Sequence, residues 1–367
     1  MDAAALTVFW VVVGARFLLP LLIPRFPLPA VLACLVLDGV DQTIFQTMGY
    51  DPPGYQGYDK AMDVFYLSVA YLATMRNWTS RPAFAVARFL FFYRLVGVVA
   101  FELTEWRPLL VIFPNTFEYF FIAYEVVRLR WQPARYGRRF WVWTAALIWV
   151  VVKLPQEWWI HIAQLDFTDT VKNVPWFGPA VVAAVVALLL VFWFVVRPRL
   201  DPPDWGWRVP ADPLPEAIDT APERAAWVSA HGRVWSGPTL EKVVLVGLVS
   251  IIYAQVLPAA RATPTELFLG LAVFVTANAA ITLAAARAAR TVESLLAAFL
   301  VRVGINLGLL WLSAWLLGMQ KGGVDLGAGQ FFVLLMSLLT ALHDRFWPVH
   351  EVRAEAHEAT GAAPAPA

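Results

Sequence analysis

Charged side chains lie inside apolar stretches of the first half of the chain, where they could bind or transfer a charged species. Asp38 and Asp41 are three residues apart and therefore share one face of a helix. Glu118 and Glu125, seven residues apart, also share a face. Ionisable groups at membrane depth are costly and usually face the interior of a helix bundle. The residues that could line a pathway are Asp38, Asp41, Arg88, Arg94, Glu118 and Glu125.

Two explanations fit these charges, and both stay open at the level of sequence. The side chains could form salt bridges that fix the packing of the helices. Alternatively, they could line an aqueous or proton-relaying pathway. The four acids outnumber Arg88, Arg94 and the nearby Arg16, and a carboxyl without an arginine partner can bind and release a proton. We expect Glu118, nearest the middle of its apolar segment, to do this, with Asp38 as the second choice.

A second group of polar residues lies in or beside the loops between apolar segments. Glu157 and His161 are spaced i, i+4, so on a helix they point the same way. A carboxylate–imidazole pair with neighbouring acids can hold a divalent metal or act as an acid–base pair. The alternative is an interfacial helix with ordinary salt bridges. The residues of this candidate outward-facing site are Asp59, Asp63, Glu157, His161, Asp166 and Asp169.

Composition and missing motifs exclude several classes of protein. A net charge of +1 argues against a nucleic-acid partner. A single cysteine, Cys34, excludes an intramolecular disulfide and a cysteine-based zinc site. The HExxH, GxSxG and GxxxxGK[ST] patterns are absent. We therefore expect no resident cofactor, with a divalent metal at the outer face as the alternative.

Eleven apolar segments are long enough to position these residues as transmembrane helices. The 367-residue chain is 60% hydrophobic and 15% charged, and its mean hydropathy is +0.62. A soluble domain has about 25% charged residues, whereas about 20 apolar residues form a helix that crosses a bilayer. The sequence predicts an all-α polytopic bundle of about eleven transmembrane helices. The predicted spans are 4–24, 28–47, 61–77, 82–102, 108–127, 140–158, 177–196, 241–259, 264–286, 293–317 and 329–344.

The distribution of basic residues predicts the orientation of these spans. Eighteen of the 28 Lys and Arg residues fall in loops on one side, and six fall on the other side. Basic loops are retained in the cytoplasm, so we expect the N-terminus outside and the C-terminus in the cytoplasm. No basic leader precedes the first span, which we expect to be retained rather than cleaved. The arginine-rich, lysine-poor composition suggests a GC-rich bacterial genome, and we expect the bacterial inner (cell) membrane.

Prolines divide the chain into parts. Residues 197–240 are crowded with proline, which resists a packed core and predicts a cytoplasmic linker lying against the membrane. We expect a seven-span block with the buried charges at 1–196, a four-span block at 241–344 and a disordered tail at 345–367. In the second block Arg302 has no evident acidic partner, so it could pair with the first block or bind a lipid or substrate anion.

These patterns favour a transporter or channel-like protein that moves protons, cations or a small polar solute through the first block. Two alternatives remain. One is a membrane-embedded enzyme whose acidic and histidine site faces outward. The other is a non-catalytic anchor subunit in which the charges bridge helices. The lipid bilayer is the expected partner in each case, and a homo-oligomer or a membrane complex is a further option.

Overall fold

A computed structural model of the chain describes residues 3–47, 55–165, 167–256, 263–288, 295–316 and 326–361. These residues form helices and the loops that join them, with no strand among them, so the all-α prediction is confirmed for this part of the chain. Before residue 197 the α-helices are α1 (Ala3–Leu18), α2 (Pro27–Thr47), α3 (Tyr55–Asn77), α4 (Arg81–Thr104), α5 (Pro108–Ile112), α6 (Thr116–Arg128), α7 (Arg138–Leu147), α8 (Leu154–Glu157), α9 (Phe167–Asn173) and α10 (Phe177–Val191).

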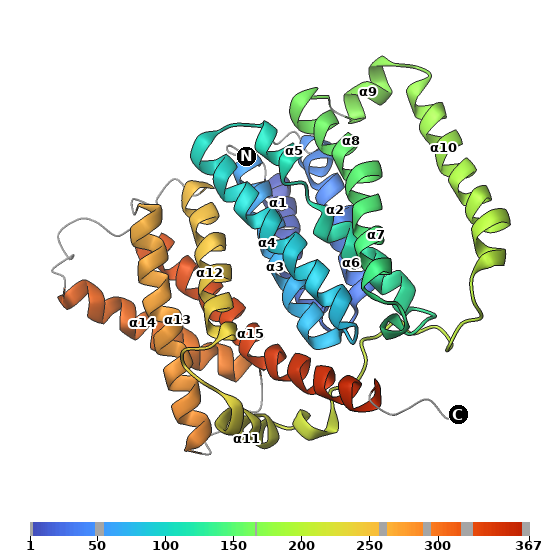
Figure 1. The fold of residues 1–367 in the computed structure, drawn as a ribbon. Helices are drawn as coiled ribbons and strands as arrows, with labels where there is room; N and C mark the ends of the chain where they lie inside the picture. The colour runs from blue at the N-terminus through green and yellow to red at the C-terminus, as the bar shows by residue number, and fades with distance from the viewer. Residues whose placement is uncertain are drawn as a thin grey trace, which may run out of the picture.

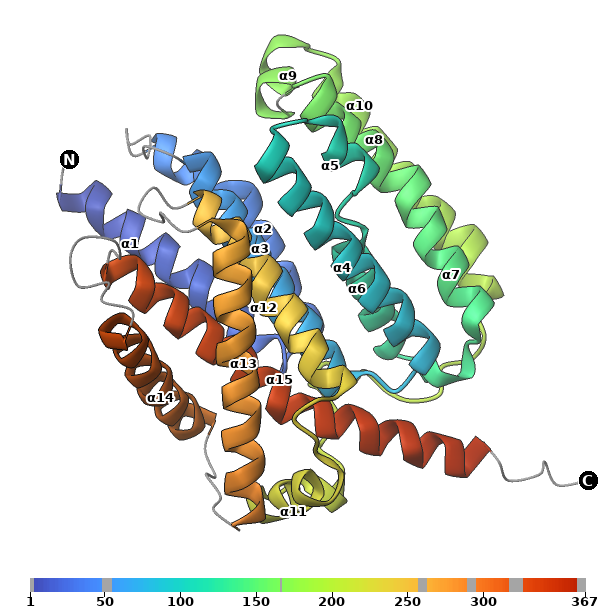
Figure 2. The same cartoon turned by 60° about the vertical axis from the view of Figure 1, so that its left-hand side comes forward.

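The later helices complete the bundle. They are α11 (Ala221–His231), α12 (Gly237–Val256), α13 (Pro264–Arg287), α14 (Leu295–Leu316) and α15 (Leu326–Gly361). The long helices of the first half lie side by side, and α5, α8 and α9 lie at one end of the molecule (Figure 1). The short helix α11 lies at the opposite end, below α13 and beside α15 (Figure 2).

Five helical segments are long and apolar enough to cross a membrane, which is compatible with a membrane protein. They are Arg81–Thr104, Pro108–Arg128, Phe177–Arg199, Gly237–Gln255 and Leu267–Arg287, and each matches one predicted span. The segment that begins with α10 is the clearest. None of its apolar window is buried inside the protein, and Leu188 and Phe194 are each 69% exposed. Such an all-round apolar helix is compatible with lipid and unfavourable in water.

The other six predicted spans coincide with helices whose length and hydropathy do not establish that they cross a membrane. Among them, α3 carries Asp59 and Asp63 and is nevertheless enclosed by α1, α2, α4, α12 and α15. Its Tyr71 and Leu72 are completely buried. A helix shielded by its neighbours does not need an apolar surface, so hydropathy is a poor guide to its position. The total of eleven spans therefore stays a prediction.

The helices before and after the proline-rich segment share one hydrophobic core. Tyr71 of α3, Leu245 of α12 and Leu339 of α15 are all fully buried within it. The hydroxyl of Tyr253 on α12 donates a hydrogen bond of 2.6 Å to the carbonyl of Ala61 on α3. The two predicted membrane blocks therefore pack against each other through α3.

Arginines hold the proline-rich segment against one end of the bundle. Arg128 at the end of α6 donates to the carbonyl of Pro210 at 3.1 Å. Arg353 of α15 donates to the carbonyl of Pro213 at 2.7 Å. The carbonyls of Pro210 and Pro213 lie outside the helices, so these arginines supply their hydrogen-bond partners. The segment is thereby held against both halves of the molecule.

The C-terminal region differs from the predicted disordered tail at 345–367. Helix α15 continues through Pro348 to Gly361. Val349 is fully buried, and Arg353 donates to the carbonyl of Asn77 at the end of α3 at 3.1 Å. Packing and these hydrogen bonds stabilise a segment whose composition alone indicates disorder. Residues 362–367 lie outside the described part of the chain.

Candidate functional site

The guanidinium of Arg16, near the end of α1, is surrounded by four carboxylates. Asp38 and Asp41 come from α2, and Asp59 and Asp63 come from the first turns of α3. Nη1 lies 2.5 Å from Asp41 and 2.8 Å from Asp59. Nη2 lies 3.0 Å from Asp63 and also contacts Asp38. We call these five residues the Arg16 cluster. It joins two residues of the predicted pathway with two of the predicted outer-face site.

The Arg16 cluster carries an excess of negative charge on one side. One guanidinium faces four carboxylates, and the side chains of Arg16 and Asp41 are 5% and 0% exposed. The side chains of Asp38, Asp59 and Asp63 are 32%, 34% and 38% exposed. Like charges at such short range repel one another unless a proton or a cation neutralises them. The cluster can therefore take up positive charge from its exposed side.

Three carboxylates of the cluster also have the spacing of a metal site. One oxygen from each of Asp38, Asp59 and Asp63 lies within 4.8 Å of the other two. Carboxylate oxygens are the ligands that Mg²⁺ and Ca²⁺ prefer. The same three carboxylates bind the guanidinium of Arg16, so a metal ion would have to compete with it.

A helix interrupted in its middle lies beside the Arg16 cluster. The sequence predicts one span over 108–127, but α5 ends at Ile112 and α6 begins at Thr116, with Pro114 between them. Proline lacks the amide hydrogen of a continuing helix and disfavours the helical conformation of the preceding residue. An interrupted helix exposes backbone groups inside a bundle, where they can bind ions or polar side chains.

Helix α4 supplies partners for the backbone at this interruption. The hydroxyl of Tyr93 donates to the carbonyl of Ile112 at 3.0 Å. Nη1 of Arg94 donates to the carbonyl of Phe113 at 2.9 Å. The close approach requires a glycine, because a Cβ atom on Gly97 would lie 2.1 Å from the Cβ of Phe113. Arg94 is thus anchored at the interruption.

Glu118 lies in the first turn of α6, directly after the interruption. Its carboxylate accepts hydrogen bonds from the hydroxyl of Tyr66 at 2.7 Å and from the side-chain amide of Asn115 at 3.1 Å. The residue is only 7% exposed. The charges of Lys153 and Arg94 act on it electrostatically, and the N-terminus of α6 also favours a negative charge. Glu118 is therefore a buried carboxylate that both cations and the acid Asp38 influence.

The Glu157–His161 pair continues these contacts away from Glu118. The backbone amide of Asn115 donates to Glu157 at 3.0 Å, and Nε2 of His161 lies 3.0 Å from the same carboxylate. Both residues belong to a helical run that contains π-helical turns at Ile148–Lys153 and Trp158–Ile162. Asp166 and the side chain of Asp169, the other predicted members of this group, lie outside the described residues.

Tyr66 connects Glu118 with the Arg16 cluster. Tyr66, Arg16 and Asp38 line a small cavity of about 10 Å³. This volume is at the lower limit for a single water molecule. A series of polar groups therefore runs from His161 and Glu157, through the interruption, to Tyr66, and the small cavity lies between Tyr66 and the Arg16 cluster.

Two residues of the predicted pathway, Arg88 and Glu125, pair with residues outside the Arg16 cluster. Arg88 pairs with Glu241 of α12 at 3.0 Å. Glu125 accepts hydrogen bonds from Arg128 at 2.6 Å and from the indole of Trp78 at 2.9 Å. The structure does not bring Arg88 or Glu125 to the Arg16 cluster. Of the predicted pathway residues, Asp38 and Asp41 lie in the cluster, and Glu118 and Arg94 lie at the helix interruption.

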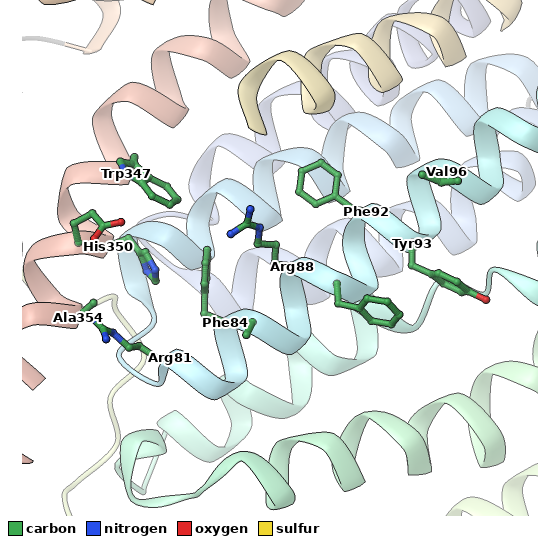
Figure 3. Close-up of a pocket in the computed structure, with 12 residues that line it drawn as sticks. Arg81, Phe84, Arg88, Phe92, Tyr93, Val96, Trp347, His350 and Ala354 are labelled. Carbon is green, nitrogen blue, oxygen red and sulfur yellow. The ribbon is translucent and has the colours of Figure 1, made fainter. Parts of the chain in front are cut away.

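Arg88 lines a groove of about 770 Å³ between α4 and α15. In Figure 3 Arg88 and Phe84 from α4 face Trp347 and His350 from α15. His350 lies beyond the predicted spans, and burial lowers its pKa to about 4. The imidazole is therefore neutral near pH 7, and this groove combines aromatic side chains with the arginine of an existing ion pair.

A second cluster of buried charges joins α12, α14 and α15. Asp344 lies 2.5 Å from Lys242 and 2.8 Å from Arg302. Asp344 is therefore the acidic partner of Arg302, which was not identified from the sequence. The neighbouring His343 is 1% exposed, and within the described part of the chain neither of its ring nitrogens has a hydrogen-bond partner.

Comparison with protein families, characterised proteins and solved structures gives no match to this chain. Function is therefore inferred from side chains and their contacts. Two members of the site escaped the sequence analysis. Tyr66 has no signal in the sequence, because its partner is 52 residues away. The interruption does have a signal in the sequence, because Pro114 and Asn115 lie in the middle of an otherwise apolar segment.

Proposed function

We propose that this protein is a membrane transporter that moves protons or small cations through its N-terminal helices. The observation that carries the proposal is the sharing of one buried guanidinium by four carboxylates, three of them partly exposed. Such a cluster binds a proton or a cation, and an exchange of ion-pair partners at Arg16 would release it. A set of structural salt bridges would need no such excess of acid.

The polar series from the Arg16 cluster to His161 supports a route for protons. In the proposed relay, Tyr66 passes its hydroxyl proton to the carboxylate of Glu118 and receives another from water in the adjoining cavity, and that water takes up a proton from the protonated carboxyl of Asp38. Tyr66 is unchanged after each transfer, and one proton has moved from the cluster to Glu118. Beyond Glu118 the proton passes by water to the carboxylate of Glu157 and on to His161, while Asn115 holds both carboxylates in place by donating its side-chain amide to Glu118 and its backbone amide to Glu157. Interrupted helices with charged neighbours are common in the binding sites of transporters.

The proposal includes a position in the membrane. We place the chain in a bacterial inner membrane as a multi-pass protein of eleven spans, with the N-terminus outside and the C-terminus in the cytoplasm. The five apolar segments and the distribution of Lys and Arg support this arrangement. The bilayer is then the main partner, and the protein could also form a homo-oligomer.

Flux in proteoliposomes tests the proposal. Wild type, Glu118→Gln and the control Asp201→Asn are incorporated at equal density, and proton, Na⁺ and K⁺ flux is measured under imposed gradients. Asp201 is a suitable control because its side chain is 62% exposed and pairs with Arg135, outside the polar series. We expect Glu118→Gln to reduce the flux on the order of a hundredfold, as for loss of a positioned proton-transfer group. Asp201→Asn should retain the wild-type flux.

Other outcomes separate this proposal from its alternatives. A folded wild type that carries no flux of these ions overturns it. Tightly bound metal that is lost in His161→Ala would instead favour a membrane-embedded enzyme. A stable protein partner together with a silent wild type would favour an anchor subunit. If Glu118→Gln shows the wild-type flux, the protein is still a transporter, but Glu118 does not lie on the route.

A further inference from the structure

A cavity of about 230 Å³ lies under the linker helix α11, between that helix and α13, α14 and α15. Its charged lining consists of Arg224 from α11, Arg302 from α14, and Asp344 and Arg345 from α15. Three arginines and one aspartate thus line the same space. Small and branched apolar residues such as Ala285 form much of the remaining wall.

Arg345 is the group that most clearly lacks a counterion. Within the described part of the chain it makes no hydrogen bond or ion pair. Burial and the nearby charge of Arg224 lower the pKa of its guanidinium. Arg224 itself donates to the carbonyls of Ile218 and Asp219 through the single nitrogen Nη1, and the acids that act on its charge, Asp219 and Glu223, do not line the cavity.

The single carboxylate in the cavity does not balance these charges. Asp344 lies 2.8 Å from Arg302 and 2.5 Å from Lys242, so two cations already share it. Lys242 belongs to an adjacent cavity of about 330 Å³, which Asp344 also lines. The lining of the cavity under α11 therefore carries more positive than negative charge, in a partly enclosed space where charge interactions are stronger than in water.

The shape and composition of the cavity indicate the class of ligand. Arginine forks recognise phosphate oxygens in pairs, and a dianionic or monoanionic phosphate can contact more than one guanidinium at once. The volume is below that of a site for a drug-sized ligand, which is about 300 Å³ or more. It suits a phosphate group together with a short apolar or glycerol-like segment against the alanine-rich wall.

We propose that the cavity lined by Arg224, Arg302 and Arg345 binds a phosphate group under α11. The phosphate belongs either to the headgroup of an anionic phospholipid or to a soluble phosphate. This site is separate from the Arg16 cluster and does not depend on the transport proposal. Bound phosphate would link α11 to α14 and α15 through charge-assisted hydrogen bonds.

Thermal unfolding of the full-length protein in detergent micelles tests the site. The unfolding midpoint is followed during titration with inorganic phosphate, phosphatidylglycerol or phosphatidylcholine. A ligand that binds only the folded protein raises the midpoint as its concentration exceeds the dissociation constant. We expect phosphatidylglycerol or inorganic phosphate to raise the midpoint of wild type, and phosphatidylcholine to have a smaller effect.

Variants assign the effect to the cavity. Arg345→Gln should weaken the apparent affinity about tenfold, which corresponds to about 1.4 kcal/mol. Arg224→Gln should act in the same direction and serves if Arg345→Gln does not fold. Arg139→Gln is the matched control, because Arg139 is exposed and does not line the cavity.

The two sources of phosphate give different results. A response to phosphatidylglycerol without a response to inorganic phosphate assigns the site to a lipid headgroup, and a response to inorganic phosphate assigns it to a soluble phosphate. Equal stabilisation by phosphatidylcholine and phosphatidylglycerol, with no response to phosphate, would overturn the proposal. So would a response that is the same in wild type, Arg345→Gln and Arg224→Gln.

Discussion

At Arg16, a guanidinium that is almost completely buried neutralises carboxylates from two neighbouring helices. Removing it would leave Asp41 buried without this cation and would increase the repulsion among the other acids. Loss of one partner of a buried ion pair costs about 3–5 kcal/mol. We therefore expect Arg16→Gln to lower the unfolding midpoint strongly, as measured by thermal unfolding in detergent.

Lys60→Gln is the control for this prediction. Lys60 lies next to Asp59 in α3, and its side chain is 36% exposed in an ion pair with Glu102. Loss of a pair that is open to solvent costs about 1 kcal/mol or less. Equal unfolding midpoints for Arg16→Gln and Lys60→Gln would show that Arg16 does not organise the cluster.

The sequence provides candidate residues within one helix but not their partners in other helices. The spacing of Glu157 and His161 predicts that they point the same way, because both lie on one helical run, and they form a pair at 3.0 Å. The convergence of Asp38 and Asp63 on Arg16 joins three helices. Helical periodicity contains no information about which faces of different helices meet, so this contact could not be predicted.

At the scale of elements, the close packing of α4 against the interruption depends on Gly97. A Cβ atom there would lie 2.1 Å from the Cβ of Phe113, so Gly97→Ala must push α4 away from the segment that holds Glu118. Overpacking of this kind costs about 1–3 kcal/mol. We expect a lower unfolding midpoint and a reduced flux in the proteoliposome assay.

Gly270→Ala provides the comparison for Gly97→Ala. Gly270 also lies within a helix, but no described atom beyond the adjoining backbone of that helix and the two neighbouring residues lies within 4 Å of the position that its Cβ would take. Alanine is favoured over glycine in a helix by about 1 kcal/mol. Gly270→Ala should therefore leave stability unchanged or raise it. A similar loss in both variants would contradict the role given to Gly97.

The interruption between α5 and α6 shows what sequence patterns miss at this scale. The apolar residues of 108–127 predict one continuous span, and Pro114 was the signal against it. Proline is tolerated in membrane helices when neighbours supply partners for the freed backbone groups. Tyr93 and Arg94 supply them here, and the sequence does not reveal that α4 lies alongside.

At the scale of the whole molecule, the proposed topology makes a prediction about accessibility. Lys172 and Ala230 are exposed positions on either side of the apolar segment Phe177–Arg199. In a Cys34→Ala background, Lys172→Cys should react with a membrane-impermeant thiol reagent in intact cells. Ala230→Cys should react only after the membrane is opened. Equal labelling of both positions in intact cells would contradict a crossing by this segment.

Composition and periodicity predicted the helical class of the molecule and the five apolar segments, because burial in lipid imposes a strong pattern. They were less informative about helices that are surrounded by other helices rather than by lipid. Helix α3 is polar and enclosed by other helices. The end of α15 is polar in composition, yet it is ordered by Val349 and Arg353. Both depend on tertiary contacts that composition does not record.

The most direct test of the central claim removes the excess acid while retaining the buried ion pair. In Asp59→Asn/Asp63→Asn, Arg16 keeps Asp38 and Asp41, so its charge stays neutralised and folding should be preserved. We predict that proton or cation flux in proteoliposomes falls on the order of a hundredfold relative to wild type. The control Asp201→Asn should match wild type. Wild-type flux in the double variant, at equal incorporation, would contradict the assignment of the Arg16 cluster as the transport site.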